Sequence, residues 1–118
     1  MKKGFIINLG SVDDIAIGHG KRFVVKGEEL AVFRCRDGKI RALKNRCPQG
    51  GGSLADGFIE RDIVMCSLHE HGFDLKTGKG TTGKERVSVY EAWIEHGDIF
   101  VEFEPSTERK SSFYENAN

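Results

Sequence analysis

The sequence has little proline, few cysteines and no long apolar run. Two prolines and three cysteines occur in 118 residues, and three cysteines are too few for a disulfide framework. No segment approaches the roughly 20 apolar residues of a membrane span. The apolar start Phe5–Ile7 ends at Asn8, which is too short for a signal peptide. We therefore expect a cytoplasmic protein with no membrane partner, in which the cysteines stay reduced.

Neither sign of charge is in excess. Lys and Arg together number 18, as do Asp and Glu, so the formal net charge is zero. A protein that neutralises nucleic-acid phosphates carries a basic surplus, so we expect no nucleic-acid partner. The remaining composition, 38% hydrophobic with 15 glycines, is that of a folded domain with a glycine excess. At this length one domain is expected.

Short apolar segments separated by glycines predict an all-β fold, an antiparallel sandwich or barrel. Two hairpin turns are indicated, a type I′ turn at Asp37-Gly38 and a similar turn at Gly97-Asp98. A helix is predicted only at residues 12–16, after the N-cap candidate Ser11. The expected strands cover residues 5–8, 22–25, 30–35, 39–43, 58–60, 63–66, 86–90, 92–95 and 99–103.

The last residues differ in composition from the rest of the chain. Ser, Thr, Glu, Arg, Lys and Asn dominate residues 105–118, and only Phe113 and Tyr114 offer much apolar surface. We expect the folded domain to span residues 1–104 and the polar C-terminal tail, 105–118, to be flexible.

Two cysteine-containing segments interrupt the strand pattern. The first cysteine loop runs Cys-Pro-Gln-Gly-Gly-Gly-Ser-Leu over residues 47–54, and the second begins Cys-Ser-Leu-His-Glu-His at residue 66. If the fold brings both loops to one end of the sandwich, their thiols and imidazoles suit a soft or borderline metal. The glycines at 50–52 would let the backbone approach a cluster and donate N–H groups to its sulfurs.

These segments resemble the cluster loops of Rieske-type [2Fe-2S] domains, and more narrowly the small subunits of assimilatory NAD(P)H nitrite reductases. The first loop of that family is Cys-Pro-His-x-Gly-x-x-Leu, which residues 47–54 follow everywhere except at Gln49. The second, Cys-Pro-x-His followed by Phe-Asp, is matched by Cys66, His69, Phe73 and Asp74. The resemblance covers about residues 4–104. It implies an all-β Rieske sandwich with a small cluster-binding subdomain at about residues 45–78.

The resemblance also implies a ligand set. In Rieske centres two Cys hold one iron and two His hold the other, so Cys47 and Cys66 would bind the first iron and His69 the second. Gln49 takes the fourth position, and its carboxamide oxygen is a harder donor than imidazole. Cys35 has no partner at ligand spacing and is expected to pack in the core.

Three states of the site are open. A [2Fe-2S] cluster binds, with Gln49, water or His71 completing the second iron, and is labile. Alternatively the cluster is absent and the domain is a structural or accessory subunit. In the third state Cys47, Cys66, His69 and His71 hold Zn²⁺.

The function implied is electron transfer, without catalytic residues of the chain's own. The implied partner is the large flavin, sirohaem and iron–sulfur subunit of a nitrite reductase that uses NAD(P)H. A stand-alone Rieske ferredoxin that serves an oxygenase is a further alternative. The predicted protein is thus a non-catalytic or electron-transfer subunit of an oxidoreductase.

Overall fold

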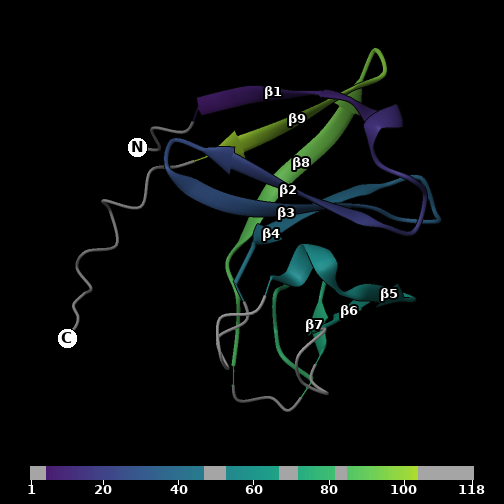
Figure 1. Ribbon diagram of the computed structural model, residues 1–118, viewed down its shortest axis with the longest axis vertical. Helices are drawn as coiled ribbons and strands as arrows, with labels where there is room; N and C mark the ends of the chain where they lie inside the picture. Colours follow the sequence, from purple (N-terminus) through teal and green to yellow (C-terminus); the bar gives the residue numbers. More distant parts are fainter. Residues whose placement is uncertain (1–4, 47–52, 67–71, 82–84, 104–118) are drawn as a thin grey trace.

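The computed structural model describes residues 5–46, 53–66, 72–81 and 85–103, and these form two antiparallel sheets (Figure 1). The larger has six strands in the order β1-β9-β8-β4-β3-β2, and the smaller has three in the order β5-β6-β7. The strands are β1 (Phe5–Ser11), β2 (Gly20–Val25), β3 (Glu28–Arg34), β4 (Ile40–Lys44), β5 (Phe58–Glu60), β6 (Ile63–Met65), β7 (Gly72–Asp74), β8 (Val89–Glu95) and β9 (Asp98–Phe103). No helix among the described residues is long and apolar enough to cross a membrane.

Two 3-10 helices complete the described structure, η1 (Val12–Asp14) and η2 (Leu54–Asp56). The first confirms Ser11 as an N-cap, because its side chain accepts a hydrogen bond from the Asp13 N–H at 3.0 Å. The helical segment is shorter than predicted, since it ends at Asp14 and Ile15 is extended and buried. η2 begins at Leu54, the last residue of the first cysteine loop, and lies between the two sheets (Figure 1).

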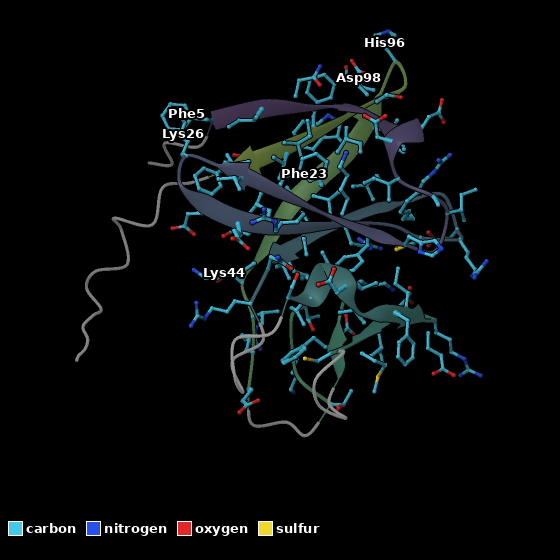
Figure 2. All side chains as sticks on the ribbon, viewed as in Figure 1. Phe5, Phe23, Lys26, Lys44, His96 and Asp98 are labelled. Atoms are coloured by element: carbon cyan, nitrogen blue, oxygen red, sulfur yellow. The ribbon has the colours of Figure 1, made fainter. Side chains whose placement is uncertain are left out.

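The six-stranded sheet curls so that its two ends approach each other. Lys26, in the turn between β2 and β3, places its ammonium 4.7 Å from the ring centroid of Phe5, the first residue of β1 (Figure 2). The hollow of the curled sheet is filled by one of the two core clusters, which buries Ile15, Val25, Leu30, Val32, Ile40, Ala42, Ile99, Val101 and Phe103.

Strand β3 separates this core from a second one. Leu30 and Val32 belong to the first cluster, whereas the alternate residues Ala31 and Phe33 belong to a cluster shared with the small sheet. All four are fully buried, which explains why the strand reads as a continuous apolar run rather than an alternating one. The second core therefore attaches the small sheet to the six-stranded one.

The predicted strands overlap the observed ones with two differences: β7 (Gly72–Asp74) was not predicted, and the segment before β9 is divided differently. Residues 86–90 and 92–95 were expected as two strands, but a single strand, β8, begins at Val89. The residues before β8 instead pair with the segment that follows β7. Arg86 forms an isolated bridge with Lys79, and the Val87 N–H donates to the Gly78 carbonyl. The chain thus passes from one sheet to the other before β8 pairs with β4.

The two hairpin turns differ from the prediction. Asp37 does not have a positive φ, so Asp37-Gly38 is not a type I′ turn; the Gly38 N–H donates to the Cys35 carbonyl, and only Gly38 is left-handed, with φ 89°. The turn between β8 and β9 centres on His96-Gly97, with φ 54° and 80°, one residue earlier than predicted. Both φ values are positive there, as a type I′ turn requires.

Candidate metal centre

The described ends of both cysteine loops lie at the same end of the small sheet. Phe58, the first residue of β5, pairs with Met65, the last residue of β6, and Met65 also pairs with Gly72, the first residue of β7. Because the strands are antiparallel, the residues before β5, after β6 and before β7 lie at the same end of the sheet. The chain therefore leaves the first cysteine loop beside Cys66.

Two glycines make this close approach possible. A Cβ at Gly57 would overlap the carbonyl oxygen of Met65, and a Cβ at Gly72 would lie 2.5 Å from a methyl group of Ile63. Neither has a positive φ, so space rather than backbone conformation requires glycine here. The first of these contacts places the segment after the first cysteine loop directly against the strand that precedes Cys66.

Cys66 directly follows β6 and is buried, with 3% of its surface exposed. Its thiol is free, and it belongs to the core cluster that contains Leu54, Val64 and Phe73. A thiolate is the ligand that iron–sulfur clusters require, and an apolar shell around a ligand limits solvent access to the metal. The position and chemistry of Cys66 therefore suit a cluster ligand.

The chain re-enters the small sheet at Gly72, where Thr81 fixes it. The Gly72 N–H donates to Thr81 Oγ1 at 3.2 Å, and the Thr81 N–H donates to the Gly72 carbonyl at 2.9 Å. The Leu75 N–H in turn donates to the Asp62 carbonyl at 2.8 Å, which holds the exit of β7 beside the entry of β6. The residues on either side of the second cysteine loop, Met65 and Gly72, therefore belong to the same sheet.

The first cysteine loop is tied at its base by Asn45. The carboxamide oxygen of Asn45 accepts from the Ala55 N–H at 2.8 Å, and its Nδ2 donates to Ser53 Oγ at 2.9 Å. Neither Asn45 nor Thr81 was predicted as part of the site. The sequence signal of Asn45 is a polar side chain next to a cysteine loop, and that signal does not reveal which backbone groups it meets. Thr81 lies nine residues after Gly72 and has no such signal.

Four of the five predicted site residues lie outside the part of the chain that the structure describes. Cys47, Gln49, His69 and His71 lie outside the described residues, and so does the tail with Phe113 and Tyr114. Within the described part of the chain no group of three or more His, Cys, Asp or Glu side chains could hold a metal ion. Cys66 is therefore the one predicted ligand whose surroundings the structure describes.

Cys35 is a packing residue, as predicted. It is 4% exposed and belongs to the same core cluster as Cys66. Burial raises the pKa of its thiol, as does the charge of Asp37, while Arg41 acts in the opposite direction. A buried thiol with a raised pKa is less reactive and a poorer metal ligand than an ordinary one.

Comparison with known proteins identifies the family. The sequence profile described as "Rieske [2Fe-2S] domain" matches residues 6–91. The ferredoxin component of a naphthalene 1,2-dioxygenase/salicylate 5-hydroxylase system from Ralstonia sp. is 32% identical over 100 residues, which cover 83% of this chain and 95% of the relative.

Solved structures agree on the fold. A protein from Mycobacterium tuberculosis, described as an NADH-dependent nitrite reductase small subunit, superimposes with a TM-score of 0.82 at 22% identity over 88% of this chain and 99% of its own. The ferredoxin of carbazole 1,9a-dioxygenase from Nocardioides aromaticivorans IC177 gives a TM-score of 0.74 at 26% identity, over 81% and 95% of the two chains. These matches confirm the predicted all-β Rieske fold. The chain belongs to the Rieske [2Fe-2S] domain family.

Proposed function

We propose that this protein is a one-electron carrier with a [2Fe-2S] cluster held by Cys47 and Cys66 on one iron and by His69 on the other. The observation that carries the proposal is the position of Cys66, a free buried thiol after the central strand β6, at the end of the small sheet that the described ends of both cysteine loops approach. The donor set fits the cluster at three of four positions, because two thiolates and an imidazole are Rieske ligands.

The fourth position is the departure from the family pattern. Gln49 stands where the first-loop motif has His, and His71 lies two residues after His69. A neutral oxygen donor binds a cluster iron less well than imidazole, so we expect a labile cluster. When bound, the cluster supplies a single reversible electron transfer, in the range of roughly −150 to +300 mV for Rieske centres.

The residues of this chain hold and shield that group rather than transform a substrate. The core cluster around Cys66 keeps water from one side of its thiol. The Gly57 and Gly72 contacts bring the loop ends together. We therefore assign no catalytic residue to this chain, and we propose that a larger partner protein transforms the substrate.

For the partner we propose a larger oxidoreductase of one of two classes. The 32% identity to a dioxygenase ferredoxin over nearly the whole of that protein favours a terminal oxygenase. The resemblance of residues 47–54 and 66–74 to nitrite reductase small subunits favours the large subunit of such a reductase. Adding the reduced protein to each kind of partner and following reoxidation of its visible spectrum separates the two: only the true class reoxidises it rapidly.

A second candidate function is a cluster-free accessory subunit, and Gln49 is the observation that favours it. Both candidates predict the same fold, and they differ in iron content. The protein should be reconstituted anaerobically with ferrous iron and sulfide, beside Cys66→Ser and the matched control Cys35→Ser. Electron transfer predicts bound iron and sulfide in the wild type and in the control, and loss of both in Cys66→Ser. Equal, negligible iron in all three proteins would support the accessory role.

A further inference from the structure

Asn45 is the one polar side chain that is buried among the residues the structure describes, with 4% of its surface exposed. It follows β4, which ends at Lys44, and precedes Cys47 by two residues. Its backbone N–H donates to the carbonyl of Glu29 at 3.0 Å, which continues the hydrogen bonding of the sheet by one residue. The backbone of Asn45 is thus fixed to β3 immediately before the first cysteine loop starts.

The carboxamide of Asn45 is fully used. Its oxygen accepts from the Ala55 N–H at 2.8 Å and from the Ser53 hydroxyl at 3.2 Å. Its Nδ2 donates to Ser53 Oγ at 2.9 Å and to Glu29 Oε1 at 3.3 Å. Ser53 lies at the end of the loop, Ala55 directly follows it and Asn45 precedes it, so the side chain joins the two ends of the first cysteine loop.

The carboxylate that receives Nδ2 is itself held. Glu29 Oε2 accepts from Arg22 Nη1 at 2.7 Å, so the charge of Glu29 is paired on its other oxygen. This orientation of Glu29 determines which way the amide of Asn45 faces, because only the NH₂ side donates to a carboxylate. The oxygen of Asn45 is therefore directed at Ala55 and Ser53.

The same contacts lead to the second cysteine loop. Ala55 lies in η2 and belongs to the core cluster that contains Cys66. Two residues later Gly57 packs against the Met65 carbonyl, next to Cys66 in the chain. A displacement of Ala55 is therefore transmitted to the neighbourhood of Cys66 through direct contacts.

We propose that Asn45 is a positioning residue for the iron–sulfur site: its carboxamide closes the first cysteine loop and thereby sets the position of Cys47 relative to Cys66. This inference rests on the proposed function, since the spacing of two thiols matters when one iron binds both. Groups that hydrogen-bond around a metal site orient its ligands, and their loss typically lowers metal affinity 10–100-fold. Asn45 acts through the loop ends and is not itself a ligand.

The test compares three variants reconstituted with iron and sulfide under anaerobic conditions. Asn45→Ala removes all four side-chain hydrogen bonds. Ser53→Ala removes the two to the Ser53 hydroxyl and leaves those to Ala55 and Glu29. Ile99→Val deletes one methyl group from the fully buried Ile99 in the other core cluster and is the control for a general loss of stability. For each protein the thermal midpoint, the rate of cluster loss to EDTA and the reduction potential are measured.

The expected result is graded. Asn45→Ala should lose its cluster about tenfold faster than the wild type or more and should shift the reduction potential, while Ser53→Ala shows a smaller change of the same sign. Ile99→Val should lower the thermal midpoint and leave cluster loss and potential at their wild-type values. If Asn45→Ala fails to fold, Ser53→Ala against Ile99→Val decides the question.

Two other outcomes would overturn the positioning role of Asn45, and only the second would also overturn the proposed function. If the wild type binds a cluster and the Asn45 and Ser53 variants retain it with unchanged rate and potential, the positioning role is overturned and the proposed function stands. If the wild type binds none, the proposed function itself is overturned, and the positioning role with it.

Discussion

Substitution of Gly57 by alanine tests whether the two cysteine loops meet where the structure places them. The added Cβ would overlap the carbonyl oxygen of Met65 and lie 3.1 Å from its carbonyl carbon and 3.2 Å from the Leu54 oxygen. All three atoms belong to the backbone, so no side chain can rotate away. β5 must therefore separate from β6, which moves the end of the first cysteine loop away from Cys66.

The expected loss can be worked from these contacts. Forcing a methyl group into a packed region costs about 1–3 kcal/mol. The backbone at Gly57, with φ −78° and ψ 179°, is allowed for alanine, so the smaller unfolded-state entropy returns about 0.4–1 kcal/mol. A net loss of about 1–2 kcal/mol follows, which lowers the thermal midpoint by about 4–8 °C per kcal/mol in a domain of this size.

The assay is urea unfolding followed by circular dichroism, beside iron retention after reconstitution. Gly38→Asn is the matched control, because Gly38 has no heavy atom within 4 Å of its would-be Cβ and asparagine tolerates its positive φ. We expect the control to keep its cluster and to change stability by less than about 1 kcal/mol. A Gly57→Ala protein as stable as the wild type, with the same iron content, would refute the close approach of β5 and β6.

Three further predictions concern other parts of the chain. Phe73→Ala should cost about 3–5 kcal/mol in urea unfolding, since Phe73 is fully buried in the second core; a loss under about 1 kcal/mol would contradict that packing. The pKa of Cys35 is raised above its ordinary 9.0, so its contribution to stability is present below pH 9 and is lost as pH rises above it. Between pH 8 and 10.5, Cys35→Ala should therefore unfold with a shallower pH dependence than the wild type, and identical slopes would contradict the shift. Lys26→Met removes the cation above Phe5 and should cost about 0.5–1 kcal/mol at low salt; no change in the thermal midpoint would count against that contact.

Eight of the nine described strands were predictable because their side chains are locally informative, and β7 was not. The run Leu30–Phe33 is apolar at each position, and the structure buries it on both faces. The exact turns were less predictable, because Asp37-Gly38 and His96-Gly97 differ in which residue adopts a positive φ. That choice depends on the register of the paired strands. The register is set by the neighbouring strands and not by the two turn residues alone.

The motif of the site was predictable, but the residues that position its loops were not. Cys66 could be singled out from its spacing to His69 and Phe73. Nothing local indicates that Gly57 must lack a side chain, since the atom it would meet belongs to Met65 on another strand. Asn45 is similar, because its partners Ser53 and Ala55 become neighbours only when the first cysteine loop closes.

The resemblance to a Rieske domain was confirmed by the family match over residues 6–91 and by the shared fold. The ligand set and the role of Gln49 remain predictions, because Cys47, Gln49, His69 and His71 lie outside the described part of the chain. The substitution Gln49→His addresses them directly. If imidazole is the missing donor, the Gln49→His variant should lose its cluster to a chelator more slowly than the wild type.

The most direct test of the central claim is the iron and acid-labile sulfide content of the full-length protein purified without oxygen, measured together with its reversible reduction in a redox titration. The proposed function predicts two irons and two sulfides per chain, as the family's cluster requires, and a visible spectrum that bleaches on uptake of one electron and recovers on oxidation. A folded, colourless protein without iron or sulfide would contradict it.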